Sequence, residues 1–225
     1  MTGGRRPIAT FALIHGAGDG GWYWHRAEAE LRARGHDTVA PDLPAGDPGA
    51  TLSTYADAVV EALGERTEPV VVAQSFGGFT APLVCDRIPS RLLVLVAGMI
   101  PTPGEPPDDW WTATGYEASE QTDDAIATYY HDVPRELAEE ALRRERDHPS
   151  AASGREPWPL PAWPDVPTRF LLCRGDRLFP AGFLRRVAHE RLGITPDEID
   201  GGHCIALSRP VELADRLEAY VADEG

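Results

Sequence analysis

The feature that most restricts the fold is a series of short, continuous apolar segments separated by helical patterns. A strand that is apolar on both faces is typical of a parallel sheet with helices on each side, because neither face meets water. The alternation of strand and helix therefore predicts an α/β fold with a mostly parallel sheet. The apolar segments are residues 8–14, 38–40, 70–74, 92–97, 170–173 and, more weakly, 198–199, and the helical patterns are residues 22–34, 55–65, 77–87, 181–192 and 210–221.

Residues 101–165 interrupt this alternation. They are rich in proline, tryptophan, tyrosine and acidic residues, and helical patterns occur only near residues 123–131 and 135–147. Long insertions in compact domains are usually lids or binding elements. At 225 residues the chain fits one domain. We therefore expect a single domain with a core at residues 1–100 and 166–225 and a helical cap at residues 101–165.

The strongest local motif follows the third apolar segment, where Val70-Val71-Val72-Ala73-Gln74 runs into Ser75-Phe76-Gly77-Gly78. A strand that passes through a serine and small residues into a helix is typical of a nucleophile elbow, in which the hydroxyl projects above the sheet. Ala73 stands where this motif usually has a glycine. An ordinary strand-to-helix turn with a capping serine is the alternative. We expect Ser75 to be the nucleophile.

A serine nucleophile of this kind needs a carboxylate and then a histidine later in the chain. Asp176 follows the apolar segment 170–173 and precedes a helical pattern, where an acid that orients a histidine belongs. His203 lies in Gly201-Gly202-His203 before the last helical pattern, and none of the other six histidines is so placed. Ser75, Asp176 and His203 thus form a predicted catalytic triad.

Acyl transfer also needs hydrogen-bond donors for the oxyanion. The glycine-rich segment 14–22 follows the first apolar segment, and we expect the N–H groups of Ala17 and Phe76 to form the oxyanion hole. His15 is expected to brace this loop. Aromatic residues crowd the cap, and they favour an apolar or aromatic substrate. The predicted substrate-binding residues are Met99, Trp110, Trp111 and Tyr129.

Composition excludes several other functions. The chain has 21 basic and 36 acidic residues and a net charge of −15, which disfavours binding to nucleic acid or to anionic membranes. All basic residues are arginine, so lysine chemistry is excluded. No clustered metal-ligand spacing occurs, and we expect no metal and no organic cofactor. The three cysteines are expected to be buried free thiols.

The start of the chain has no long apolar segment, since residues 8–14 are too few to span a bilayer and no cleavage site follows them. We therefore expect a cytoplasmic protein with a small-molecule substrate. The sequence leaves the oligomeric state open, and a homodimer is one alternative.

With these residues in view, the chain resembles the α/β-hydrolase superfamily, and within it the small branch of plant methyl esterases and hydroxynitrile lyases. The resemblance covers nearly the whole chain. It implies ester hydrolysis by a serine hydrolase. The lyases of that branch add a lysine near the histidine and a threonine by the oxyanion loop, whereas this chain has no lysine and has Gly16 at the loop, so cyanide elimination is disfavoured. The matching segments are His15-Gly16-Ala17 with Trp22 and Trp24, Pro41-Asp42-Leu43-Pro44, the elbow, residues 97–103, and Gly202-His203 with residues 207–210.

The sequence therefore predicts a serine-dependent hydrolase of a small, apolar or aromatic carboxylic ester, acting through an acyl-serine intermediate. Because one fold hosts many functions, two alternatives stay open. One is a ligand-binding protein that retains the triad. The other is a biosynthetic enzyme on the same fold, such as a lactonase, a thioesterase or a C–C hydrolase.

Overall fold

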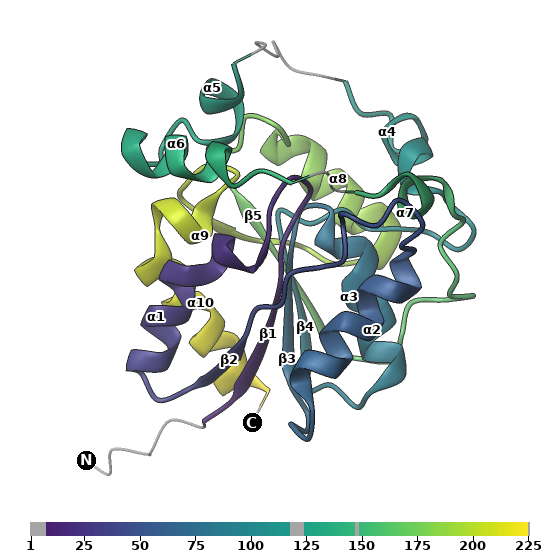
Figure 1. Ribbon diagram of the computed structural model, residues 1–225, viewed down its shortest axis with the longest axis horizontal. Coiled ribbons are helices and arrows are strands. Elements are labelled where there is room, and N and C mark those ends of the chain that lie inside the picture. The colour runs from purple at the N-terminus through teal and green to yellow at the C-terminus, as the bar shows by residue number, and fades with distance from the viewer. Residues whose placement is uncertain (1–7, 118–123, 147–148, 225) are drawn as a thin grey trace.

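A computed structural model of the protein describes residues 8–117, 124–146 and 149–224. Within these ranges six strands form one sheet in the order β2-β1-β3-β4-β5-β6 (Figure 1), and every neighbouring pair is parallel. The predicted α/β fold is confirmed. The strands are β1 (Thr10–Ile14), β2 (Asp37–Val39), β3 (Val70–Gln74), β4 (Leu92–Val96), β5 (Thr168–Cys173) and β6 (Asp197–Ile199).

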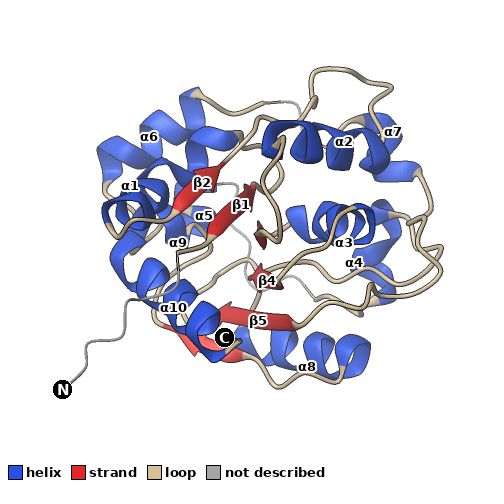
Figure 2. Cartoon of the chain, turned by 90° about the horizontal axis from the view of Figure 1, so that it is seen from below, coloured by secondary structure: helices blue, strands red, loops and turns tan. Residues whose placement is uncertain are grey.

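Helices cover both faces of the sheet, as Figure 2 shows. On one face lie α1 (His25–Ala33), which follows the 3-10 turn η1 (Gly21–Trp24), and α10 (Pro210–Asp223). On the other face lie α2 (Leu52–Leu63), α3 (Gly77–Arg87) and α8 (Ala181–Leu192). Every residue of the central strands β3 and β4 is buried as a result. This two-sided burial is the reason why these strands are continuously apolar in the sequence.

Some element ends differ from the prediction. Ile8 is exposed and the first strand begins at Thr10. Helix α2 begins at Leu52, earlier than predicted, because Thr51 caps it: the Thr51 hydroxyl accepts a hydrogen bond from the Thr54 N–H at 3.1 Å, and the Thr54 hydroxyl accepts one from the Thr51 N–H at 3.3 Å. The short helix α9 (Ile205–Ser208) after the last strand was not predicted.

The insertion between β4 and β5 lies over the carboxyl ends of the strands (Figure 1). Its two predicted helices are present but shorter, as α5 (Ala125–Tyr129) and α6 (Arg135–Arg143), and the predicted end residues Asp123 and Asp147 lie outside the described residues. Three further short elements were not predicted. The insertion contains the 3-10 turn η2 (Pro107–Asp109), α4 (Trp110–Ala113), α5 (Ala125–Tyr129), α6 (Arg135–Arg143) and α7 (Ala151–Arg155).

The two ends of the insertion are hydrogen-bonded to each other, and we call this pairing the neck of the cap. The Gly104 N–H donates to the Trp158 carbonyl at 3.0 Å, and the Trp158 N–H donates to the Glu105 carbonyl at 3.1 Å. The buried carboxylate of Glu105 accepts from the Arg191 guanidinium of α8 at 2.7 Å. The Trp158 indole donates to the Phe79 carbonyl of α3 at 3.1 Å. The neck is thereby attached to two core helices.

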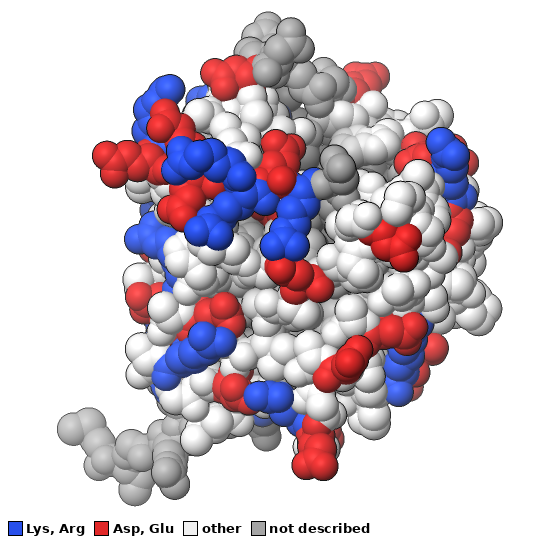
Figure 3. Space-filling model, in the orientation of Figure 1, with Lys and Arg blue, Asp and Glu red and all other residues white. Residues whose placement is uncertain are grey.

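Charged side chains of both signs lie close together over α6 on the face drawn in Figure 3. Two ion pairs there join residues one turn apart, Arg135 with Glu139 at 2.8 Å and Arg144 with Glu140 at 2.9 Å. Acidic and basic side chains are mixed here, so this face is not uniformly acidic despite the negative net charge of the chain. No helix among the described residues has the length and apolar character needed to span a bilayer.

Candidate active site

The turn between β3 and α3 holds Ser75 in a left-handed conformation, with φ of 50°. Such a conformation is unfavourable for a residue with a side chain and marks a strained turn. Neighbouring backbone holds it in place: the Ser75 N–H donates to the Val96 carbonyl at 3.3 Å, and the Met99 N–H donates to the Ser75 carbonyl at 2.9 Å. The side chain of Ser75 is thereby fixed at the carboxyl edge of the sheet.

The small residues after Ser75 are required by close backbone contacts. A Cβ atom on Gly78 would lie 1.9 Å from the Met99 carbonyl oxygen, and one on Gly77 would lie 2.9 Å from the His15 carbonyl oxygen. Helix α3 can therefore approach both neighbouring loops only with glycine at these positions. Ala73 is fully buried in β3 and pairs with Ile14 and Leu95, so its methyl group packs in the core.

Asp176 and His203 meet beside Ser75. The Nδ1 atom of His203 lies 2.8 Å from Oδ2 of Asp176, and both side chains are buried. The other carboxylate oxygen of Asp176 accepts from the N–H groups of Leu178 at 2.8 Å and Phe179 at 3.0 Å. With Oδ1 occupied in this way, the carboxylate fixes the orientation of the imidazole and favours the tautomer that carries its proton on Nδ1.

The glycine-rich loop after β1 is held by a neutral histidine. His15 Nδ1 lies 2.9 Å from the Gly16 carbonyl oxygen, and Nε2 accepts from the Leu43 N–H at 3.2 Å. Burial lowers the pKa of His15 from 6.5 to about 4. Because one nitrogen donates and the other accepts, the neutral ring satisfies both contacts. A Cβ on Gly16 would lie 2.3 Å from Oε1 of Gln74 and 3.0 Å from Cβ of Ser75, so a side chain at this position would have to displace the Gln74 amide.

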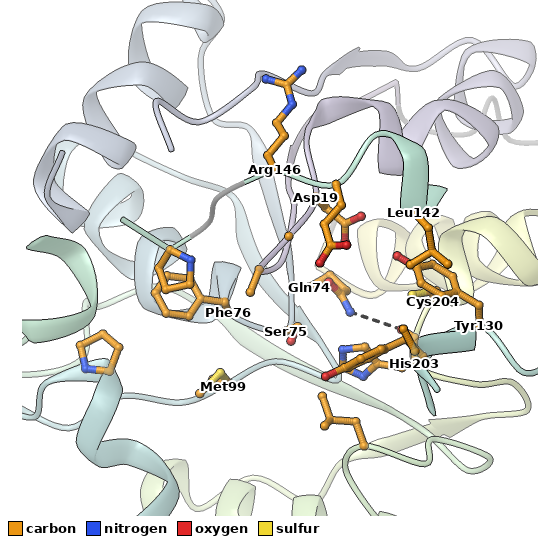
Figure 4. A pocket seen from close by; sticks show the side chains of 18 of the residues that line it. Asp19, Gln74, Ser75, Phe76, Met99, Tyr130, Leu142, Arg146, His203 and Cys204 are labelled. Atoms are coloured by element: carbon orange, nitrogen blue, oxygen red, sulfur yellow. Dashed lines mark hydrogen bonds between the residues drawn. The ribbon is translucent and has the colours of Figure 1, made fainter. Parts of the chain in front are cut away.

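One cavity of about 390 Å³ joins these features (Figure 4). Ser75 and His203 line it from the core, together with Ala17 and Phe76, whose N–H groups were predicted to form the oxyanion hole. In Figure 4 the Ser75 hydroxyl and the His203 ring lie side by side on its floor. The other lining residues are Gly18, Asp19, Gln74, Met99, Pro107, Asp108, Trp111, Ala125, Tyr129, Tyr130, Leu142, Glu145, Arg146, Pro149, Leu178 and Cys204.

Of the predicted substrate-binding residues, Met99, Trp111 and Tyr129 line the cavity, whereas Trp110 does not. Trp110 is fully buried, and its indole N–H donates to the Ile100 carbonyl at 2.9 Å. Its ring packs edge-on against Phe179 at 5.7 Å. The prediction that Trp110 contacts substrate is therefore wrong: this side chain belongs to the core beneath the cap, and its neighbour Trp111 is the one that faces the cavity.

Several lining residues were not predicted as part of the site. Gln74 directly precedes the nucleophile, and Asp19 lies inside the glycine-rich loop, so their places in those motifs are signals that would have indicated them. Glu145 follows α6, and no sequence pattern connects it with the triad. Burial raises the pKa of Asp19 from 3.8 to about 7, Glu145 raises it further, and His203 opposes the shift.

The cysteines and the potential metal ligands contribute little to this site. Cys204 lines the cavity beside His203, but burial raises the pKa of its thiol well above 9, so the thiol stays protonated. Cys85 is half-buried rather than buried, and Cys173 is buried; both are free thiols. Within the described ranges, no group of three histidine, cysteine or acidic side chains is placed to hold a metal ion.

Comparison with known proteins identifies related sequences over nearly the whole chain. The sequence model of the alpha/beta hydrolase family matches residues 11–216. Norfluorocurarine synthase 1 from Strychnos sp is 25% identical, with 95% of each chain covered. Alpha-hydroxynitrile lyase from Arabidopsis thaliana is 26% identical over 95% of this chain and 97% of its own. Methylesterase 7 from Arabidopsis thaliana is 36% identical over a shorter part, 43% of this chain and 42% of its own.

Solved structures share the same fold. Polyneuridine aldehyde esterase superposes with a TM-score of 0.78 and 19% identity, covering 96% of this chain and 100% of its own. An extracellular alpha/beta-hydrolase from a Paenibacillus species has a TM-score of 0.77 and 19% identity, covering 94% and 98%. At these identities the likeness establishes the arrangement of strands and helices.

Proposed function

Since this chain belongs to the alpha/beta hydrolase family, we propose that it is a serine esterase that cleaves a small carboxylic ester through an acyl-serine intermediate. The observation that carries the proposal is the meeting of three elements at one cavity. Ser75 stands on a strained turn, His203 lies beside it, and Asp176 orients His203 through the 2.8 Å contact. Relatives named methylesterase and esterase support ester hydrolysis as the reaction class.

In the proposed reaction the Ser75 hydroxyl attacks the ester carbonyl carbon while Nε2 of His203 takes its proton. The N–H groups of Ala17 and Phe76 stabilise the negative oxygen of the tetrahedral intermediate. His203 then protonates the leaving alcohol, and an acyl group stays on Ser75. Water, activated by the same imidazole, attacks the acyl carbon and releases the acid. Asp176 keeps its negative charge throughout and stabilises the imidazolium.

The acyl part of the substrate is proposed to be apolar or aromatic. Phe76 and Met99 lie on one side of Ser75 in Figure 4, and Trp111 and Leu178 also line the cavity. Burying an apolar group against such side chains contributes about 25 cal/mol per Å² of apolar surface removed from water. The two arginines that follow β5, Arg174 and Arg177, are not among the residues that line the cavity, and Arg174 pairs with Asp200 at 2.7 Å, so neither is placed to hold an anionic acyl group.

The test uses a fluorophosphonate probe together with a panel of short aryl esters. We expect the probe to label Ser75 and the esters to be hydrolysed, and we expect Ser75→Ala to lose both while melting at the same temperature as the wild type. Ser90→Ala, which changes a serine outside the cavity, is the matched control. Hydrolysis by Ser75→Ala at a rate near that of the wild type would overturn the proposal.

A second function on the same site is favoured by the names of two relatives, a synthase and a hydroxynitrile lyase. A non-hydrolytic enzyme or a ligand-binding protein would retain the triad geometry but fail on the ester panel. Labelling of Ser75 without hydrolysis of any ester would therefore favour this alternative over the esterase.

A further inference from the structure

Residues 201–203, which we call the histidine loop, begin with two glycines. Gly201 has φ of 141°, a conformation that favours glycine, and Gly202 directly precedes the catalytic histidine. The Gly201 carbonyl accepts from the Gly175 N–H at 2.9 Å, which joins this loop to the loop of Asp176. Because two adjacent glycines leave the backbone free to adopt many conformations, the position of the imidazole depends on bonds from outside the loop.

A turn of the cap packs against the histidine loop. This turn joins α5 to α6, which lies above α9 in Figure 1, and it contains His131 and Asp132. Oδ2 of Asp132 accepts from the Gly202 N–H at 2.7 Å, a short distance that is typical of a carboxylate acceptor. A Cβ atom on Gly202 would lie 2.5 Å from Oδ1 of Asp132 and 2.6 Å from Cε1 of His131. The turn therefore closes directly on the glycine that precedes the catalytic histidine.

Stability alone does not account for the contact of Asp132. Its second oxygen, Oδ1, is buried, and none of the described residues donates a hydrogen bond to it. A buried acceptor without a partner destabilises a fold by about as much as one hydrogen bond to a charged group stabilises it. The two effects nearly offset each other, so the contact adds little to the free energy of unfolding. Asp132 is also not among the residues that line the cavity, so it is not placed to contact a substrate.

We propose that Asp132 is a positioning residue for the reaction: by accepting from the Gly202 N–H, it fixes the backbone that carries His203. This inference rests on the proposed function. The backbone of His203 is then held on both sides, since the Gln74 amide of β3 donates to the His203 carbonyl at 3.3 Å (Figure 4). A general base must lie within hydrogen-bond reach of the Ser75 hydroxyl, and a displacement of about 1 Å lowers the rate by about 10²-fold. A residue of the cap thus acts on the reaction itself.

The experiment compares Asp132→Ala with Asp132→Asn by steady-state kinetics on the acetate and benzoate esters of one phenol. Alanine removes the acceptor, whereas the side-chain carbonyl of asparagine can still accept from the Gly202 N–H. We expect kcat of Asp132→Ala to fall by about 10²-fold for both esters while KM stays close to the wild-type value, because the imidazole moves but the lining of the cavity does not. We expect Asp132→Asn to restore kcat to near the wild-type value.

Two further variants serve as the control and as a second route to the same contact. Asp47→Ala is the control, because Asp47 also accepts from a glycine N–H, that of Gly49 at 2.9 Å, in a loop outside the cavity, and this variant should keep the wild-type kcat. Gly202→Ala places a methyl group against Asp132 and should lower kcat by pushing the turn away. Gly182→Ala, whose Cβ would meet no atom within 4 Å, is the control for this substitution.

Melting temperatures close to that of the wild type should accompany the loss of kcat in Asp132→Ala. A wild-type kcat in Asp132→Ala, or an equal loss of kcat in Asp132→Asn or in Asp47→Ala, would overturn the inference while leaving the esterase intact. If Asp132→Ala does not fold, Gly202→Ala decides, and a wild-type kcat in that variant overturns the inference. If the wild type hydrolyses neither ester and the fluorophosphonate does not label Ser75, the proposed function itself fails.

Discussion

The core and the cap hold their parts of the cavity by different kinds of contact. In the core, Ser75, Asp176 and His203 are 7%, 7% and 4% exposed, and backbone hydrogen bonds fix the turn of Ser75 and the carboxylate of Asp176. In the cap, Trp111 and Tyr129 are each 37% exposed. Trp111 is positioned by ring contacts, such as the one with Tyr116 at 5.0 Å.

The difference matters because a backbone hydrogen bond fixes atoms closely, whereas an exposed ring can change rotamer at little cost. Atoms that must meet in a reaction need the first kind of support, and atoms that adapt to a substrate can use the second. We therefore expect changes in the core to alter the rate of reaction for every substrate, and changes in the cap side chains that line the cavity to alter the preference among substrates.

The largest effect is expected for Asp176→Asn. The amide oxygen can still accept from the N–H groups of Leu178 and Phe179, so the loop should stay folded, but the imidazole loses its orienting negative charge. We expect kcat to fall by about 10⁴-fold for all esters, as for the equivalent change in serine proteases. Steady-state kinetics on one aryl ester checks this. Asp200→Asn, an exposed acid paired with Arg174, is the control, and an equal loss in both variants would contradict the assignment.

The next largest effect is expected for Trp110→Ala, which tests whether Trp110 belongs to the core rather than to the substrate site. This ring is fully buried among Phe179 and Phe183, so Trp110→Ala leaves a cavity in the core. We expect the free energy of unfolding to fall by about 3–5 kcal/mol, measured by urea denaturation. A variant that keeps wild-type stability but loses substrate preference would return Trp110 to the substrate site.

A smaller effect is expected from acid titration of the core. The pKa of His15 is lowered to about 4 in the folded protein, so the unfolded chain binds more protons between pH 4 and 6.5. The free energy of unfolding should therefore rise as the pH is raised from 4 to 6.5, and it should fall as the pH is lowered toward 4. The change in the free energy of unfolding over this interval is on the order of 3 kcal/mol. His15→Gln should flatten this part of the pH profile, and an equally steep profile in the variant would contradict the neutral, buried imidazole.

The smallest effect is expected for Trp111→Ala in the cap. Because this side chain is partly exposed, we expect a loss of stability below about 1 kcal/mol. The kcat/KM for a benzoate ester should fall about tenfold relative to the kcat/KM for the acetate ester with the same leaving group, since only the larger benzoyl group loses contact area. The rate of labelling by a small fluorophosphonate should stay close to the wild-type rate. A uniform loss for both esters would show that Trp111 supports the reaction itself.

Sequence patterns predicted the sheet well because each central strand is buried on both faces. The runs at β3 and β4 are apolar at nearly every residue, so their positions were clear. The turn after β3 was equally predictable, since the contacts of Gly77 and Gly78 leave no room for a side chain. Asp176 and His203 were predicted in another way, from the order in which a carboxylate and then a histidine follow the serine in this class of fold and from their positions after predicted strands.

The cap was less predictable because its helices are short. Helix α4 has only four residues, Trp110–Ala113, so no periodic pattern could show which of two adjacent tryptophans faces inward. Asp19 and Glu145 were missed for another reason. They come from distant segments, and only the packing of the residues after α6 against the loop after β1 brings them to the same cavity.

The neck of the cap affects how the loop beyond it can be replaced, in evolution or by protein engineering. Parallel strands such as β4 and β5 need a crossover of a dozen or more residues, so the insertion cannot simply be deleted. The bonds between Gly104, Glu105 and Trp158 already bring the ends of the loop between them together. Exchanging that loop for one of another length therefore adds little closure entropy. A lineage can replace its substrate-selecting segment as one unit while the strand register stays unchanged, provided that the new loop again offers an acceptor to the Gly202 N–H.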